Sequence, residues 1–313
     1  MTGSGGGWTV RRIRRHLRWA REQGVGRLIE EDNLDPFERI PTAARKLVWR
    51  LSHDASPHAM PIFVVGAQRS GTNMVVRGLE RSPEFDVHNE NDRAAFHRFR
   101  LRSDPVIHDL VVRSRHPYVL FKPLCDSHRI GALLDDLGTP TPGKALWVYR
   151  SVDGRVRSSL AKFGNAGGRA LRMIADGTGG HLWQAQGLSA ASLELIRSFD
   201  HDRLSPASAS ALFWYVRNAI LFERGFADRD DVAVVSYDRI VADPMPVMTA
   251  ICAFIGLEYG ERLVEGIERR GAGPHDPLPI DPQIRARCDE ITQRLDAVAL
   301  AAPARRGRFR ADG

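Results

Sequence analysis

Two segments of this chain place glycine, arginine and hydroxyl side chains directly after a short apolar run. The first is Gly66–Asn73, which reads GAQRSGTN and follows the apolar stretch PIFVV at Pro61–Val65. A loop between a strand and a helix aims backbone N–H groups and the positive end of the helix dipole at one point, which suits an anion. Glycine at positions 66 and 71 lets the backbone approach such a ligand closely. The sequence therefore predicts a phosphate-type site in this loop.

The same loop departs from the Walker pattern GxxxxGK[ST] at two positions. Thr72 stands where the pattern has lysine, and Asn73 stands where it has the Mg²⁺-binding serine or threonine. The loop thus lacks the groups that hold a β,γ-phosphate and its metal, although a P-loop kinase or NTPase stays an open alternative, as does an ordinary glycine turn.

The second segment is Ala145–Phe163, where an apolar run again leads into a helical pattern. Arg150 stands at the end of the run, and Ser158 follows eight positions later. Arginine offers a planar fork to phosphate oxygens, and we expect Ser158 in the first helical turn, where a hydroxyl lies beside free N–H groups. Arg155 and Arg157 could assist, but we expect both to face solvent.

The two segments together resemble the donor-binding motifs of sulfotransferases that use 3′-phosphoadenosine 5′-phosphosulfate (PAPS). The family's first motif has a basic residue, commonly lysine, followed by serine or threonine and then Gly-Thr; Arg69 holds the basic position here. The segment Val232–Leu257 is similar to a late structural segment of the family. The resemblance implies that Arg150 and Ser158 bind the 3′-phosphate. It implies that the 5′-phosphosulfate is bound by Gly66, Gln68, Arg69, Ser70, Gly71, Thr72 and Asn73.

Sulfuryl transfer requires in-line positioning and cations beside the leaving oxygen, much as phosphoryl transfer does. Arg69 is one candidate cation. Lys122, at the end of the strand-like run YVLFK, matches a strand-terminal lysine of the family and is the other. We expect both to be catalytic.

A hydroxyl acceptor also needs a base near its proton. The cytosolic family branch has a histidine two residues after the strand-terminal lysine, but this chain has Leu124 there. The glycan-modifying branch uses a glutamate shortly after the phosphate-loop helix, and Glu90 holds a similar place. His88 and Asp126 are the alternatives. We expect Glu90 to be the base.

Apolar runs alternating with helical patterns must position these groups. The runs are Pro61–Val65, Tyr118–Phe121, Ala145–Tyr149 and Val232–Ser236, and the helical patterns include residues 73–81, 158–175 and 207–224. Such alternation predicts a three-layer α/β/α fold with a central parallel sheet. We expect this P-loop NTPase-like domain to span residues 59–313. A helical extension should occupy residues 1–58, with a basic helix at 8–21 and another at 41–51. We expect the basic helix to pack on the catalytic domain or to form a mobile arm, and contact with an anionic membrane surface is the alternative.

Composition limits the remaining possibilities. The chain has 313 residues, a formal net charge of +7 and no apolar run near the ~20 residues of a membrane span, so we expect a cytoplasmic protein. Cys125, Cys252 and Cys288 form no metal or disulfide pattern and are expected to be buried thiols. No metal is expected. The net charge is the only feature that suggests nucleic-acid binding, and because no recognition motif accompanies it we expect none.

The sequence therefore predicts a PAPS-dependent sulfotransferase acting on an acceptor hydroxyl. A glycan, a lipid or a small metabolite all remain open as the acceptor. A non-catalytic module that binds the nucleotide without performing the chemistry is a further alternative.

Overall fold

The computed structural model describes residues 36–53, 56, 58–267 and 276–300. The chain divides into two compact units, Met1–His53 and Asp54–Gly313. In the first unit helix α3 spans Pro36–Ser52 and includes the expected helix at 41–51. The expected basic helix at 8–21 lies outside the described residues. The predicted domain boundary between residues 58 and 59 stays a prediction.

The second unit is built on a five-stranded sheet in the order β2-β5-β1-β6-β7, in which all neighbouring strands run parallel. The four expected strands are present, and β2, which the sequence pattern did not indicate, adds an edge. The strands are β1 (Met60–Val65), β2 (Phe85–His88), β5 (Tyr118–Phe121), β6 (Lys144–Tyr149) and β7 (Val232–Ser236).

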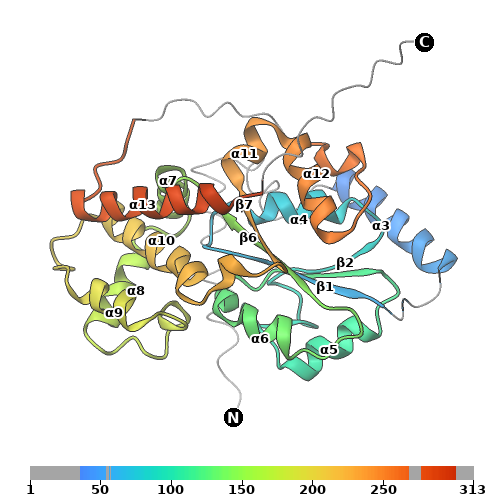
Figure 1. The fold of residues 1–313 in the computed structure, drawn as a ribbon, viewed down its shortest axis with the longest axis horizontal. Helices are drawn as coiled ribbons and strands as arrows, with labels where there is room; N and C mark the ends of the chain where they lie inside the picture. The colour runs from blue at the N-terminus through green and yellow to red at the C-terminus, as the bar shows by residue number, and fades with distance from the viewer. Residues whose placement is uncertain (1–35, 54–55, 57, 268–275, 301–313) are drawn as a thin grey trace. The chain divides into compact units, whose positions relative to one another are not determined.

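Side chains of β1 alternate between two hydrophobic cores, one on each face of the sheet. Ile62 and Val64 belong to the core that also holds residues of α4, α11 and α12. Phe63 and Val65 belong to the core that includes residues of α5, α6, α10 and α13. Figure 1 shows the strands running between these helices. The expected three-layer α/β/α arrangement is confirmed.

The bounds of these helices follow from their capping residues and turns. The helices of the first face are α4 (Thr72–Glu80), α11 (Tyr237–Ala242) and α12 (Pro244–Ile255). Those of the second face are α5 (Asp104–Val112), α6 (Ile130–Asp135), α10 (Pro206–Glu223) and α13 (Pro282–Val298). The Ser205 hydroxyl accepts the N–H of Ser208 and caps α10, while Asp281 caps α13 in the same way. Asp243 precedes α12, whose first residue is Pro244, as the sequence predicts.

The expected single helix at 158–175 is wrong in one respect, because the structure has two helices there. Helix α7 spans Val152–Phe163 and α8 spans Ala166–Ala175, with Gly164 at a φ of +53° between them. Asp153 lies in the first turn of α7, where a carboxylate favours a helix start. Ser158 therefore lies in the middle of α7 and not in its first turn, so its own N–H is not among the free helix-end donors.

Short elements complete the described part of the chain. They are the hairpin of β3 (Phe96–His97) and β4 (Arg100–Leu101), helix α9 (Ala190–Arg197), and the 3₁₀ turns η1 (Leu124–Arg129), η2 (Trp183–Ala185), η3 (Phe226–Asp228) and η4 (Glu261–Val264). None of the helices in these described ranges has both the length and the apolar character needed to span a bilayer.

Candidate functional site

The loop between β1 and α4 has the tight backbone that its glycines predict. Gly66 has a φ of +126° and Gly71 a φ of +90°. A Cβ atom on Gly66 would lie 2.2 Å from the carbonyl oxygen of Val148. Arg69 also adopts a positive φ, +72°, which is uncommon for a residue with a side chain. Such conformations concentrate at ligand-binding sites, which agrees with an anion-binding role for this loop.

The two predicted anion-binding segments meet in the structure. Arg69 Nε donates a hydrogen bond to Ser158 Oγ at 3.0 Å, which joins the β1–α4 loop to α7. The guanidinium carbon of Arg150 lies 4.5 Å from the ring centre of Tyr237. A Cβ atom on Gly71 would come within 2.0 Å of the same ring. The two arginines come from separate sequence motifs, and the structure brings both to the β1–α4 loop.

Two polar groups of this neighbourhood are buried without a partner. The Nε of Arg150 and the hydroxyl of Ser70 make no hydrogen bond within the described part of the chain. Ser70 is fully buried, and Thr72 is 4% exposed. A buried donor without an acceptor is costly. Each of these donors lacks an acceptor, and a bound anion is one group that could supply it.

Arg155 is buried beside the phosphate loop, and the prediction that it faces solvent is wrong. It is 2% exposed, its Nε donates to the carbonyl oxygen of Gln68 at 3.1 Å, and its Nη1 donates to Ser210. Burial, and to a lesser degree the nearby Arg69, lower the pKa of Arg155 to about 9. The available signal was the spacing: residues 155 and 158 are three apart on α7 and so share a helix face.

Arg157, also expected in solvent, is half-buried instead. Its Nη2 donates to the carbonyl oxygen of Asp276. The neighbouring Asp153 is paired with Arg285 of α13, whose bond holds the pKa of that carboxyl below its usual value. This end of α7 is thus attached to the segment that leads into α13.

Lys122 and Glu90 lie together beside the phosphate loop. Lys122 follows the last residue of β5 and is 7% exposed; its Nζ donates to Asn73 Oδ1 at 2.6 Å and lies 3.4 Å from Glu90 Oε2. Burial raises the pKa of Glu90, while the charge of Lys122 acts in the opposite direction. The structure therefore brings a candidate base, a candidate cation and the loop residue Asn73 into contact.

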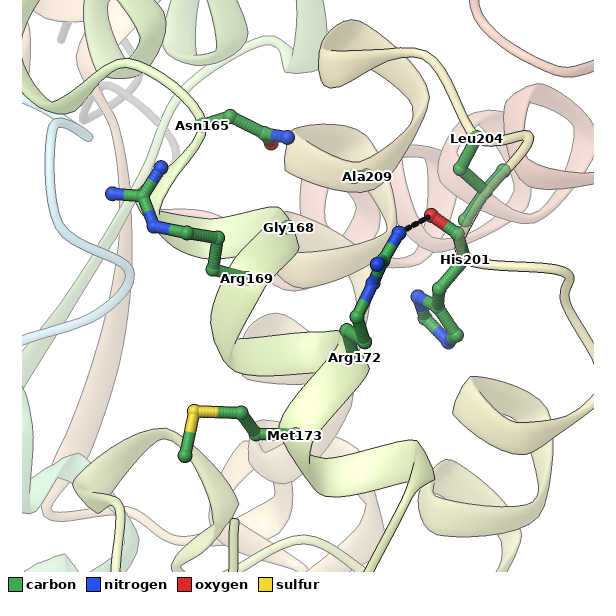
Figure 2. Close-up of a pocket in the computed structure, with 8 residues that line it drawn as sticks. All are labelled: Asn165, Gly168, Arg169, Arg172, Met173, His201, Leu204 and Ala209. Carbon is green, nitrogen blue, oxygen red and sulfur yellow. Dashed lines mark hydrogen bonds between the residues drawn. The ribbon is translucent and has the colours of Figure 1, made fainter. Parts of the chain in front are cut away.

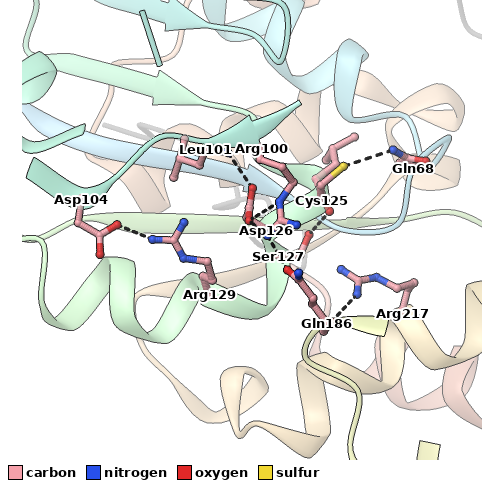
Figure 3. A network of polar contacts seen from close by, with 11 residues as sticks. Gln68, Arg100, Leu101, Asp104, Cys125, Asp126, Ser127, Arg129, Gln186 and Arg217 are labelled. Atoms are coloured by element: carbon pink, nitrogen blue, oxygen red, sulfur yellow. Dashed lines mark hydrogen bonds and ion pairs between the residues drawn. The ribbon is translucent and has the colours of Figure 1, made fainter. Parts of the chain in front are cut away.

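The alternative bases are held in other networks. Asp126 is fully buried and accepts hydrogen bonds from Arg100 Nε at 2.9 Å, Arg100 Nη2 at 2.6 Å and the N–H of Leu101 at 2.8 Å (Figure 3). The Nδ1 of His88 lies 2.6 Å from Asp92 Oδ2. With its carboxylate oxygens already bonded, Asp126 is poorly placed to take a proton from an acceptor.

Residues of the η1 turn contact the β1–α4 loop. Ser127 Oγ accepts the N–H of Gly66 at 3.3 Å. Figure 3 shows the second contact, in which Gln68 Nε2 lies 3.8 Å from Cys125 Sγ. The three cysteines are buried, as expected, and burial raises the pKa of the Cys125 thiol. Within the described ranges, no group of three histidine, cysteine, aspartate or glutamate side chains could hold a metal ion.

Comparison with known proteins gives likeness of fold only. No protein-family model and no curated protein sequence matches this chain. Two solved structures of similar fold are a sulfotransferase from Alicyclobacillus acidocaldarius and the sulfotransferase domain of the olefin synthase from Synechococcus PCC 7002. The first has a TM-score of 0.42 and 18% identity, covering 78% of this chain and 96% of its own. The second has a TM-score of 0.35 and 13% identity, covering 80% and 100%.

Proposed function

We propose that this protein transfers the sulfuryl group of PAPS to an acceptor hydroxyl. The observation that carries the proposal is the hydrogen bond between Arg69 and Ser158, because it joins the two segments predicted to hold opposite ends of one donor. A molecule with a 5′-phosphosulfate and a 3′-phosphate on the same ribose needs two anion sites within one nucleotide's length. The contact of Arg150 with Tyr237, whose ring also covers Gly71, supports the same arrangement.

The residues present fit such a donor. The buried Nε of Arg150 and hydroxyl of Ser70 are donors in need of acceptors, and phosphate and sulfate oxygens are acceptors. Glycine at positions 66 and 71 lets the loop backbone pack against the Val148 carbonyl and the Tyr237 ring, which holds the loop in its tight conformation. We assign the 5′ end of the donor to the β1–α4 loop and the 3′-phosphate to Arg150 with Ser158.

In the proposed reaction the acceptor oxygen forms a bond to sulfur while the bond from sulfur to the bridging phosphate oxygen breaks. The electron pair of the broken bond stays on that phosphate oxygen, where the charges of Arg69 and Lys122 stabilise it. The acceptor proton passes to Glu90, which lies 3.4 Å from Lys122 Nζ. Burial raises the pKa of Glu90, which makes its carboxylate a stronger base, while the charge of Lys122 partly offsets that rise.

The test is transfer from ³⁵S-labelled PAPS to a panel of glycan, lipid and small-molecule hydroxyls, together with binding of the product 3′-phosphoadenosine 5′-phosphate (PAP). Arg150→Ala should weaken PAP binding by about 10- to 100-fold, the effect of losing charge-assisted bonds. Arg197→Ala, on the exposed surface of α9, is the matched control and should bind PAP normally.

The other outcomes separate the rival functions. PAP binding without transfer to any acceptor would favour a non-catalytic nucleotide-binding module. Mg²⁺-dependent ATP hydrolysis would favour a kinase or NTPase. Wild-type PAP affinity in the Arg150→Ala variant would contradict the assignment of the 3′-phosphate.

A further inference from the structure

A groove of about 510 Å³ lies between α8, the segment that follows α9 and the start of α10. Its size is within the range of small-molecule sites, roughly 300–1,000 Å³. Leu204, Ala209 and Met173 contribute apolar surface, and the other lining groups include Asn165, Arg169 and Arg172 (Figure 2). The groove is separate from the residues assigned to the donor.

Packing contacts connect this groove to the phosphate loop. A Cβ atom on Gly168, in the groove wall, would lie 3.0 Å from the Cβ of Ala209 on α10. One turn further along α10, the ring centre of Phe213 lies 5.2 Å from the guanidinium carbon of Arg155. Arg155 in turn bonds the carbonyl oxygen of Gln68 in the loop. These contacts connect the groove wall to the phosphate loop through buried side chains of α7 and α10.

The polar groups of the groove differ in whether they already have partners. Arg172 is paired: its Nη2 lies 2.5 Å from Asp202 Oδ1 and donates to the carbonyl oxygen of His201 at 2.9 Å. The His201 ring is bonded to the carbonyl oxygen of Ile196 at 2.7 Å. These groups have their charge or hydrogen bonds satisfied by the protein.

Arg169 and Asn165 differ from that pair. In the part of the chain that the structure describes, no carboxylate contacts the exposed side chain of Arg169, so its positive charge is uncompensated. The Oδ1 of Asn165 is buried and has no hydrogen-bond donor. Among the described residues, this wall of the groove therefore presents a cation, Arg169, without a paired carboxylate. It also presents a hydrogen-bond acceptor, Asn165 Oδ1, without a hydrogen-bond donor.

We propose that this groove binds a part of the acceptor that carries both a hydroxyl and an anionic group, as an acidic sugar residue does. The anion pairs with Arg169, a hydroxyl donates to Asn165 Oδ1, and the carbon ring packs on Leu204 and Met173. This inference rests on the proposed function, because the ligand is an acceptor only if the protein transfers a sulfuryl group. Binding in the groove can be tested without any donor.

The experiment compares two probes that differ only at C6, methyl β-D-glucuronide and methyl β-D-glucoside. Each is titrated into the full chain carrying ¹³C-methyl methionine, with and without saturating PAP to occupy the donor site. Met173 lines the groove and reports binding there, whereas the exposed Met245 of α12 serves as the internal control. We expect the glucuronide to shift the Met173 signal and to bind about 10- to 100-fold more tightly than the glucoside.

Charge variants complete the test. Arg169→Glu should remove the preference for the glucuronide, Arg169→Lys should keep part of it, and Arg197→Glu, the same charge change on exposed α9, should leave it unchanged. Equal affinity for the two probes, no shift at Met173, or an unaltered preference in Arg169→Glu would each overturn the inference. Failure of PAP binding with an intact Met173 response would instead count against the proposed function alone.

Discussion

Gly66 allows the backbone geometry of the phosphate loop to be tested directly. A Cβ atom at this position would lie 2.2 Å from the carbonyl oxygen of Val148, a backbone atom of β6. The two backbones would have to separate by roughly 1 Å to reach ordinary contact distance. Because β1 and β6 are paired neighbours in the middle of the sheet, that separation would strain their hydrogen bonds. Gly66→Ala should therefore destabilise the fold and displace the loop.

The expected magnitude has two parts. A positive φ costs alanine about 1–2 kcal/mol relative to glycine. Overpacking against a fixed backbone adds about 1–3 kcal/mol, so Gly66→Ala should lower the free energy of unfolding by about 2–5 kcal/mol. Gly138 is a matched control, because its φ is +69° but a Cβ atom there meets nothing within 4 Å. Gly138→Ala should show the first part alone.

Urea denaturation of both variants measures these changes, and calorimetric titration with PAP measures the effect on the donor site. Gly66→Ala should lose more stability than Gly138→Ala and should also bind PAP more weakly. Equal losses of stability in the two variants would refute the steric reasoning. Normal PAP affinity in a folded Gly66→Ala variant would refute the link between this backbone and the donor.

Three side chains give the remaining predictions. Arg155→Met removes the bond to the Gln68 carbonyl and should raise the KM for PAPS about tenfold with a small effect on kcat; Arg155→Lys should restore part of the loss. Glu90→Gln should lower kcat by about 10²- to 10⁴-fold and abolish an acidic limb of the pH–rate profile. Since burial raises the pKa of Glu90, the wild-type protein should also lose stability as pH rises from 4.5 through that pKa, measured by denaturation against pH, and Glu90→Gln should not. Burial and Arg217 lower the pKa of His128 to about 4, so the free energy of unfolding should fall as pH drops from 6.5 towards 4, and His128→Asn should flatten that change. An unchanged KM in Arg155→Met, a retained acidic limb in Glu90→Gln or an unaltered pH slope in His128→Asn would contradict the corresponding argument.

The strands that carry the site could be predicted because they are buried on both faces. Such strands are continuous apolar runs, and Tyr118–Phe121 and Val232–Ser236 have the expected bounds. The strand Phe85–His88 escaped prediction because Asp86 and His88 interrupt its apolar pattern. Its sequence therefore resembles a loop, whereas the other edge strand, Val232–Ser236, is apolar up to its final serine.

Some residues of the candidate site could likewise be indicated by the sequence, and others could not. Local motifs predicted the loop, Arg150 and Ser158, since their spacing along the chain is itself the signal. Arg155 was missed because its role depends on α10: the carbonyl oxygen and hydroxyl of Ser210 accept its Nη1, each at 2.9 Å. No pattern near residue 155 indicates which distant helix will pack there.

The break between α7 and α8 relates the donor site to the groove. Had residues 158–175 formed one straight helix, the positions after 163 would have continued along the axis of α7, at 1.5 Å per residue. Gly164, with a φ of +53°, ends α7 and lets α8 change direction. As a result Ser158 contacts the phosphate loop from α7, while Asn165 and Arg169 line the groove from α8. A single glycine thus separates the helix that contacts the phosphate loop from the helix that lines the groove. A sequence pattern that predicts one continuous helix therefore cannot predict the groove.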